Sequence, residues 1–270
     1  MNNPIQQVTR SGDGPYGSTV AELRADANTD KRAEQSGRLL QDLFPEFFAG
    51  ACLLLFCAPL VKSADIAFDR LVMHWLGGLP RILVFLPLVF IAISYCLHCT
   101  RRRPNKWAVL LGIVGPGLVL GIQANRIAML SLQLGDRLAS SDCRTFPLKY
   151  DLEREWQAAA TFRSSCPATA YAVQDCPGYS EEASQHPSWN FLWFLETKYE
   201  CSGWCDVQNP LWQAGDASGD SCSRAVAIAM TSRIRHNANQ IMVYCLFVVS
   251  LSVIVLVMLG PSLRTNGMDW

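Results

Sequence analysis

Four long apolar segments, separated by polar stretches of very different length, dominate the hydropathy pattern of this chain. They cover residues 43–61, 82–100, 107–134 and 240–263. A helix needs about 20 residues to cross the ~30 Å hydrocarbon core of a bilayer, so each segment is long enough to span a membrane. One such segment alone could be a buried core helix. Four of them in a chain of 270 residues predict an all-α membrane protein with four transmembrane helices.

The polar stretches define the remaining parts of the chain. Residues 1–42 are rich in Asn, Asp, Gly and Ser, and we expect a disordered tail there. Residues 62–81 form a short connection, and residues 101–106 form a very short one. Residues 135–239 form a long, polar connection, and residues 264–270 form a second tail. The largest soluble part is therefore expected between the third and fourth spans.

The charges beside the spans indicate an orientation. Residues 101–106 contain four positive charges, and short basic connections stay in the cytoplasm. Alternation then predicts that both termini are cytoplasmic, with a small extracellular loop at 62–81 and a large one at 135–239. Arg233 and Arg235, just before the fourth span, run against this orientation. Long translocated segments do not obey the charge rule, so the prediction stands.

The distribution of cysteines favours the same orientation. Six of the eleven cysteines lie in the predicted large loop. Six cysteines on the oxidising side of a membrane predict three disulfides, which a domain this small needs for its stability. The sequence leaves the pairing open. The six are Cys143, Cys166, Cys176, Cys201, Cys205 and Cys222.

Two stretches of the large loop have distinctive patterns. Residues 151–162 are amphipathic, with Leu152 and Trp156 on one face, and we expect this helix to continue outward from the third span. Residues 188–199 carry five aromatic side chains. This second stretch is compatible with the core of a small domain, with a partner-binding surface and with contact to the outer leaflet. The sequence leaves these three alternatives open.

The most specific pattern in the loop is Cys201-Ser202-Gly203-Trp204-Cys205, followed by Pro210 and Cys222. With its spans and loop sizes, the chain over residues 43–263 resembles the tetraspanins, whose large loop carries a Cys-Cys-Gly motif and downstream cysteines. Cys201 and Gly203 match the first and third motif positions, while Ser202 replaces the second cysteine. Cys205 is the candidate for the missing thiol. Cys143, Cys166 and Cys176 have no clear counterpart.

The resemblance carries two expectations about the loop. It implies a mainly helical, disulfide-stabilised large extracellular loop. It also implies that Cys201 and Cys205 each pair outside the motif, one of them with Cys222. No Asn-x-Ser/Thr sequon occurs in the sequence, so N-glycosylation of the loop is not expected.

Small and polar residues in the third span are candidates for helix packing. Gly117 and Gly121 are four residues apart, a spacing that lets helix backbones approach closely, although a glycine-rich span without such a role is equally compatible. Gln123 follows them, and the tetraspanins often carry Gln or Glu in this span. Arg126 is predicted to snorkel toward the headgroups.

Cys96 and Cys99 lie at the end of the second span, beside the basic connection. Juxtamembrane cysteines are candidates for palmitoylation. Their spacing also suggests a redox pair or half of a zinc site. Zinc needs about four ligands and no second cluster is near in the sequence, so no metal is expected.

Together these features predict a tetraspanin-like membrane scaffold, not an enzyme, that organises membrane proteins and lipids through its large loop. We expect no cofactor other than a bound sterol or other lipid, and we expect lateral protein partners, including further copies of the chain. The balanced net charge of zero argues against nucleic acid. The expected location is the plasma membrane or an endosomal or vesicle membrane. The alternatives are a membrane thiol oxidoreductase using Cys96 and Cys99, and a small-solute transporter.

Overall fold

The computed structural model describes residues 19–101, 106–213 and 219–265, and describes side chains within 43–100, 106–213 and 219–258. These residues form helices and connecting turns, with no strand among them. The elements are α1 (Thr19–Ala67), α2 (Arg70–Leu76), η1 (Leu79–Arg81), α3 (Ile82–Arg101), α4 (Lys106–Ala139), α5 (Pro147–Ser164), η2 (Val173–Asp175), α6 (Tyr179–Gln185), α7 (Ser188–Tyr199), α8 (Cys222–Ile228), η3 (Ala229–Ile234) and α9 (Arg235–Thr265).

Four helical segments of the described chain are long and apolar enough to cross a membrane, which confirms the predicted number of spans. They are Leu43–Ala67, Leu79–Thr100, Lys106–Ala139 and Cys222–Met258. All four extend further than the predicted apolar segments toward residues 62–81 or 135–239, because the helices continue through more polar residues at those ends. By length and composition these helices indicate a multi-pass membrane protein, and the described part of the chain is mainly helical.

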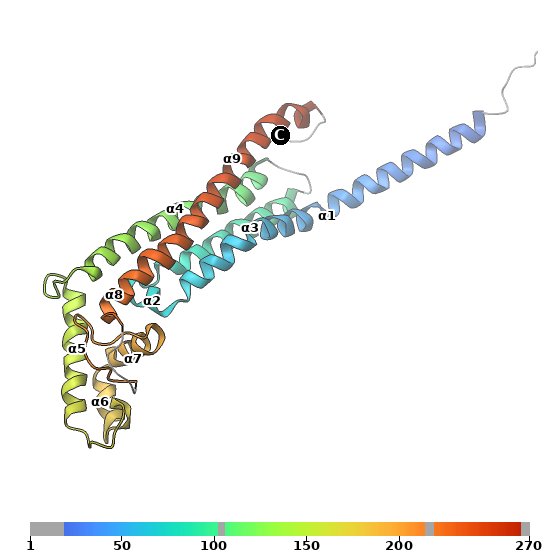
Figure 1. Cartoon of the computed structure of the whole chain (residues 1–270). Coiled ribbons are helices and arrows are strands. Elements are labelled where there is room, and N and C mark those ends of the chain that lie inside the picture. The colour runs from blue at the N-terminus through green and yellow to red at the C-terminus, as the bar shows by residue number, and fades with distance from the viewer. Residues whose placement is uncertain (1–18, 102–105, 214–218, 266–270) are drawn as a thin grey trace, which may run out of the picture.

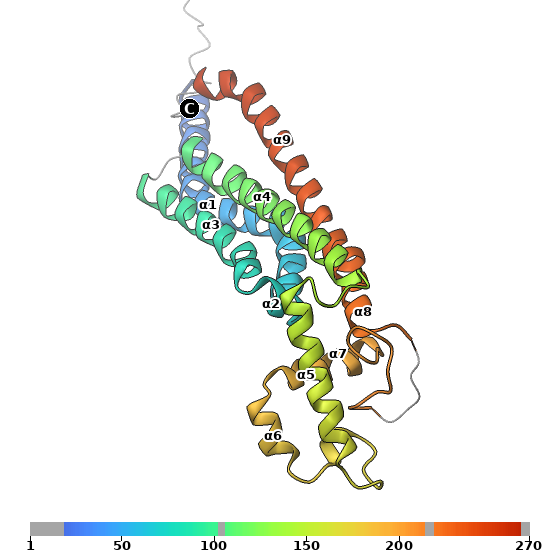
Figure 2. The same cartoon turned by 90° about the vertical axis from the view of Figure 1, so that its left-hand side faces the viewer.

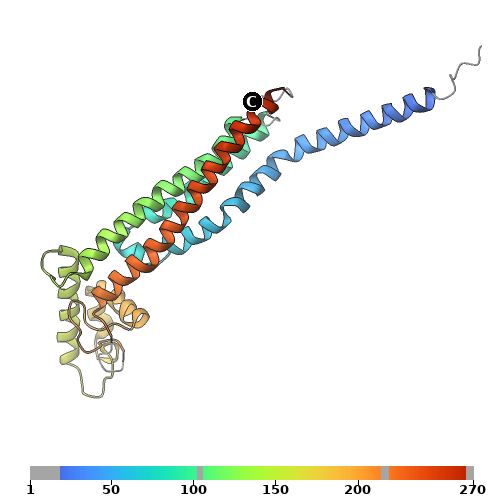
Figure 3. The same ribbon diagram turned by 45° about the horizontal axis from the view of Figure 1, so that its top comes forward.

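The four long helices run side by side as a bundle (Figure 1). Helix α3 packs against α1 and α4, α4 packs against α9, and α9 closes the bundle on α1. Residues 140–213 and 219–222, here called the loop domain, lie at one end of the bundle together with α2 (Figure 1). The C-terminal part of α9 and the N-terminal part of α1 lie at the other end (Figures 1 and 3). Turning the molecule by 90° leaves the loop domain at that same end (Figure 2).

The helix α1 differs from the expectation for residues 1–42. It begins at Thr19, so residues 19–42 are helical where the sequence composition predicted disorder. This segment contains several strong helix formers, among them Ala, Leu, Glu and Arg, and it leads directly into a long helix that removes the cost of nucleation. Residues 1–18 lie outside the described residues.

The expectation that the amphipathic helix of the loop continues the third span is wrong. The chain leaves α4 after Ala139, turns, and starts α5 at Pro147, in a new direction (Figure 1). The Asp142 side chain forms the turn by accepting hydrogen bonds from the backbone N–H groups of Arg144 and Thr145, at 2.8 and 3.3 Å. Pro147 suits the first turn of a helix because its missing N–H would have no partner there.

The fourth span continues from the loop domain through an uninterrupted helical path. Helix α8 leads into a π-helical segment at Ala229–Ile234, and this segment leads into α9. Arg233 in the π-helical segment pairs with the carboxylate of Asp69, 3.2 Å away. Asp69 also caps α2 by accepting from the Leu71 N–H at 2.8 Å. The arginine that opposes the charge rule therefore links the fourth span to the short connection.

Candidate functional site

Three disulfides hold the loop domain together. The pairs are Cys143–Cys205, Cys166–Cys176 and Cys201–Cys222, with Cα–Cα separations of 6.2, 5.5 and 4.9 Å. Cys201 and Cys205 each pair outside their own motif, and Cys201 pairs with Cys222. The expected number of disulfides and the pairing of the motif are both confirmed.

Trp204, inside the five-residue motif, is the centre of an aromatic cluster that joins three parts of the molecule. Its side chain is completely buried, and its indole N–H donates to the backbone oxygen of Lys149 in α5 at 2.8 Å. The ring of Trp75 in α2 stacks on Trp204 with ring centroids 6.3 Å apart. Phe146, just before α5, stacks on Trp75 with ring centroids 6.2 Å apart. The motif thus packs against α5 through Lys149 and against α2, in the short connection, through Trp75.

Gly203 is required by the backbone of the motif. Its φ of 72° lies in the left-handed region, and an added Cβ would collide with the carbonyl oxygen of Asp206. Its own carbonyl accepts from the Cys222 N–H at 2.9 Å, next to the disulfide that joins Cys201 to Cys222. Ser223 N–H donates to the carbonyl of Trp204 at 3.0 Å. The motif is therefore fastened to the first turn of α8 by its backbone as well as by sulfur.

Lys149 connects the loop domain to the third span. Although charged, it is 1% exposed, and its ammonium group donates to the backbone oxygens of Leu138 and Ser140 at 2.9 and 2.5 Å. Cations favour the C-terminal end of a helix, where carbonyls lack partners, and Leu138 lies in the last turn of α4. Burial lowers the pKa of Lys149, and the nearby carboxylates of Asp142 and Asp206 oppose this shift.

Glu196 fixes the segment that follows the motif. Its carboxylate is 1% exposed and accepts backbone N–H groups from Leu211, Trp212 and Gln213 at 3.1, 2.7 and 2.9 Å. Burial raises the pKa of Glu196, and the three amide hydrogen bonds pull the pKa the other way. Pro210, singled out with the motif, is half-buried and directly precedes this anchored segment. These three hydrogen bonds from Leu211–Gln213 to the Glu196 carboxylate are called the Glu196 clamp below.

Helix α7 has a buried face and an exposed face. Trp189, Leu192 and Leu195 are buried at 1%, 2% and 0% exposure, whereas Trp193 is 41% exposed. Of the three alternatives for residues 188–199, the core of a small domain is shown for the buried face. The exposed face, led by Trp193, remains available to a partner.

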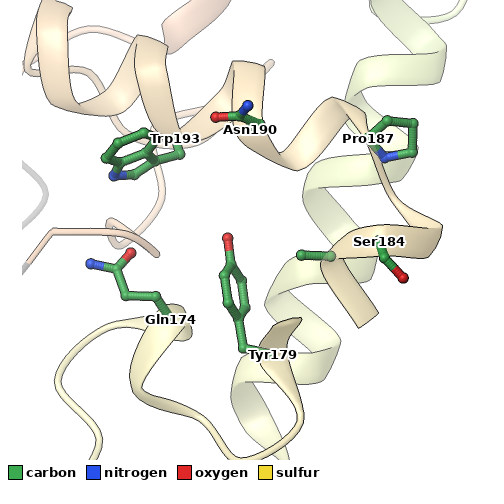
Figure 4. Close-up of a pocket in the computed structure, with 7 residues that line it drawn as sticks. Gln174, Tyr179, Ser184, Pro187, Asn190 and Trp193 are labelled. Atoms are coloured by element: carbon green, nitrogen blue, oxygen red, sulfur yellow. The ribbon is translucent and has the colours of Figure 1, made fainter. Parts of the chain in front are cut away.

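An open hollow of about 610 Å³ lies between α7 and the segment from η2 to α6. Figure 4 shows Trp193 and Asn190 of α7 facing Tyr179 and Gln174 across it, with the ring of Pro187 at one side. The tyrosine hydroxyl points into the hollow, and the Ser184 hydroxyl points away from it (Figure 4). A second hollow, of about 370 Å³, lies between α2 and α7. Its lining includes Phe68, Arg70, Met73, His74, Phe191 and Phe194.

Aromatic and cationic groups meet at this second hollow. The rings of His74 and Phe191 stack with centroids 3.7 Å apart, which joins α2 to α7. The guanidinium carbon of Arg70 lies 5.5 Å from the ring centroid of Phe194, and the Lys198 ammonium lies 5.3 Å from the same ring. Burial lowers the pKa of His74, so the neutral ring is favoured in this stack.

The glycines of the third span contact other helices of the same chain. A Cβ added at Gly117 would lie 2.5 Å from Cγ2 of Val249 in α9 and 3.7 Å from Cζ of Phe56 in α1. A Cβ added at Gly121 would lie 3.7 Å from Cβ of Cys245. Both glycines therefore pack within the bundle. Gln123 is half-buried, and its side-chain oxygen is enclosed without a hydrogen-bond partner among the described residues.

Cys96 and Cys99 are exposed free thiols near the end of α3. That end of α3 lies at the far end of the bundle from the loop domain and its disulfides (Figure 1). Arg126 is exposed on α4, as a snorkelling side chain would be. The arrangement makes both thiols accessible beside the bundle surface and separates them from the three disulfides.

Among the residues that the structure describes, one group of metal-ligating residue types comes together: Cys143, Cys205 and Glu153. The two sulfurs are joined in a disulfide, so neither is a thiolate that could bind a metal. The Glu153 carboxylate accepts the Cys205 N–H at 3.0 Å instead. This group is structural.

Sequence reasoning overlooked Lys149 and Glu196. Lys149 lies two residues before the predicted helix at 151–162, three and seven residues before Leu152 and Trp156. Glu196 lies in the aromatic stretch 188–199, four residues after Leu192, and both charged side chains are buried. A charged residue in register with an apolar face is the signal that could have identified them, because buried charges need partners.

Comparison with known proteins gives no match: no protein-family model, no curated protein and no solved structure is similar to this chain.

Proposed function

We propose that this chain is a tetraspanin-like membrane scaffold whose loop domain holds other membrane proteins beside the bundle. The observation that carries the proposal is the aromatic and cationic surface around the two hollows, here called the contact surface. It is defined by Trp193 of the first hollow and by four residues of the second: Phe68, Arg70, His74 and Phe194. Phe68 and Trp193 are 62% and 41% exposed. Aromatic and arginine side chains are the residues that most often dominate the energy of protein interfaces.

The rigidity of the loop domain supports this proposal. A surface that is already ordered loses little conformational entropy on binding, so more of the contact energy remains as affinity. Here α7 is held by the buried Trp189, by the clamp of Glu196 and by stacking on α2. The contact surface therefore has a fixed shape before any partner arrives.

The orientation belongs to the same proposal. With the basic connection at 101–106 in the cytoplasm, the loop domain is extracellular or lumenal, and both termini are cytoplasmic. The three disulfides of the loop domain are compatible with that compartment, since disulfides persist where the environment is oxidising. The membrane is the plasma membrane or an endosomal or vesicle membrane. Lipidation of Cys96 and Cys99 would then occur on the cytoplasmic side.

Site-specific photocrosslinking tests the scaffold. A benzophenone amino acid is placed at Phe68 or at Trp193 in the full-length chain, and intact membranes are irradiated before solubilisation in mild detergent. We expect discrete adducts with membrane proteins from both positions, including a tagged second copy if the chain self-associates. The matched control is Val207, which is 49% exposed in the loop domain outside the contact surface.

Two results would overturn the scaffold proposal: no discrete adduct from Phe68 or Trp193, or equal adducts from the control position Val207. The orientation is tested separately with a membrane-impermeant thiol reagent. We expect Cys96 and Cys99 to be labelled only after the cells are permeabilised and treated with hydroxylamine, which frees any lipidated thiol, with a Cys96→Ser/Cys99→Ser variant as the background. Labelling of these thiols in intact cells would invert the orientation.

A further inference from the structure

The 610 Å³ hollow between α6 and α7 has the lining of a binding site for a ligand that is polar but uncharged. Trp193 offers an exposed indole, and Tyr179 offers a hydroxyl directed into the space (Figure 4). Gln174 and Asn190 add two side-chain amides. Among the described residues that line the hollow, none is an acid or a base other than the tyrosine phenol. Its volume is in the range typical of small-molecule sites.

The hydroxyl of Tyr179 is set up as a hydrogen-bond donor toward the hollow. Its oxygen accepts the indole N–H of Trp212 at 3.2 Å. Since a phenol carries one hydrogen, that hydrogen is left for an acceptor on the open side. The two amides each supply a carbonyl acceptor and two N–H donors. The walls therefore offer donors and acceptors, and a ligand hydroxyl group needs both because it donates and accepts hydrogen bonds.

The walls of the hollow are held in place before any ligand arrives. The Tyr179 ring stacks on the buried Trp189 with centroids 6.0 Å apart, and Trp189 donates to the backbone oxygen of Glu155 at 3.1 Å. The segment carrying Gln174 is closed by the disulfide Cys166–Cys176, and Val173 N–H donates to the Leu211 carbonyl at 2.7 Å. Such preorganisation strengthens binding of a flexible, polar ligand.

An uncharged sugar matches this combination. One face of a pyranose ring carries C–H groups that pack on an indole, and its rim carries neighbouring hydroxyls that suit paired amides. A charged ligand would find no opposite charge in the lining, and an apolar one would leave the two amides and the hydroxyl without partners. We propose that the hollow binds an uncharged oligosaccharide carried by a neighbouring glycoprotein.

The position of the hollow favours a glycoprotein over a glycolipid as the source. The hollow lies between α7 and α6, and α6 lies at the end of the loop domain that is far from the bundle (Figures 1 and 2). A glycan there would approach from a neighbouring protein. The chain has no sequon of its own, so no N-linked glycan of this chain competes for the hollow. The proposal names the partner class of the scaffold and in that sense rests on the proposed function.

The test uses the purified full-length chain in detergent, titrated with soluble neutral di- and trisaccharides built from hexoses and N-acetylhexosamines. Saturation-transfer NMR and tryptophan fluorescence measure binding. We expect saturable binding of at least one saccharide, weakened about tenfold by Trp193→Ala, which removes the stacking platform. Asn190→Ala is the second variant, expected to weaken binding severalfold without touching the aromatic core. The matched control Tyr150→Ala, 47% exposed on α5, leaves binding unchanged.

Three results would overturn the assignment. The first is no binding of any soluble saccharide, and the second is binding that neither Trp193→Ala nor Asn190→Ala weakens. The third is binding only to vesicles that carry neutral glycolipids, or only to uncharged peptides. Because the assay needs no protein partner, its failure leaves the photocrosslinking result at Phe68 intact, and the two proposals fail separately.

Discussion

The bundle and the loop domain are stabilised by different means. In the bundle, close contacts involve glycines and apolar side chains, such as Gly117 against Val249 and Phe56. In the loop domain they involve three disulfides, a buried lysine, a buried glutamate and stacked tryptophans. Lipid tails are as apolar as the helices they surround, so spans associate through packing. The loop domain is too small for its apolar core to suffice, so cross-links and satisfied buried charges supplement it.

The largest effect that would separate the two regions is expected from Trp204→Ala. Removing this fully buried indole leaves a cavity and frees the Lys149 carbonyl, so the loop domain should lose about 4 kcal/mol of its free energy of unfolding. Pulse proteolysis of the full-length chain measures this. Trp193→Ala is the matched control and should lose less than about 1 kcal/mol, because its side chain is exposed. An equal loss in both variants would contradict the role of Trp204.

A smaller effect in the same region is expected when the Cys201–Cys222 disulfide is removed. The Cys201→Ala/Cys222→Ala variant removes the cross-link between two residues that are 21 apart in sequence. The loop domain should lose about 3 kcal/mol of its free energy of unfolding. The same proteolysis assay without reductant measures the loss, with the free thiol variant Cys57→Ala as the control. The SDS concentration that unfolds the bundle should stay unchanged. A parallel loss in bundle stability would show that the two regions are not independent.

The bundle itself should respond to a single methyl group. Gly117→Ala places a Cβ 2.5 Å from Cγ2 of Val249, so α4 and α9 must separate, at a cost of about 1–2 kcal/mol. SDS-titration unfolding measures this change. Gly50→Ala on α1 is the matched control, because its added Cβ has no described atom within 4 Å. Proteolysis of the loop domain should not change in either variant, and a change there would contradict the separation of the regions.

The smallest effect concerns pH and the loop domain. Because the folded pKa of Glu196 is raised above its ordinary value, the folded state holds the proton more tightly than the unfolded chain does. This contribution to stability is therefore present below the unfolded pKa and is lost as the pH rises through the folded pKa. Thermal unfolding between about pH 5 and about pH 8 should show a component that favours the acidic side.

The variant Glu196→Gln isolates that component. The glutamine cannot titrate, so only the wild type loses this contribution as the pH rises. The unfolding temperature of the wild type minus that of the variant should therefore fall with rising pH. The exposed Glu181, changed to Gln, is the control and should retain the wild-type pH slope. A Glu196→Gln variant with an unchanged slope would show that Glu196 does not set the pH response.

The overall helical layout was readable from sequence, and the reasons are physical. A segment such as 82–100 has to be apolar along its whole length to lie in hydrocarbon, so its composition alone marks it. The helix at 151–162 was visible because Leu152 and Trp156 repeat at helical spacing, and both are buried. The prediction for residues 19–42 was wrong because a polar composition argues against a hydrophobic core and not against a helical backbone.

The candidate site was only partly readable. The hollow between α6 and α7 brings together Gln174, Tyr179, Asn190 and Trp193, of which only Trp193 had been noted, as one aromatic among five. These side chains come from three segments whose mutual placement depends on the disulfide Cys166–Cys176 and on the contact of α7 with α5. No periodic pattern within one segment encodes such a meeting of side chains.

The sequence by itself determined the four spans, the position of the loop domain and the number of its disulfides, because hydropathy and cysteine count are properties of the chain alone. The tertiary structure decided that Cys143 pairs with Cys205, that Lys149 closes α4 and that Glu196 holds Leu211–Gln213. Each of these depends on groups far apart in sequence reaching within a few ångströms of each other. That proximity is set by packing around buried side chains such as Trp204, which only the folded molecule contains.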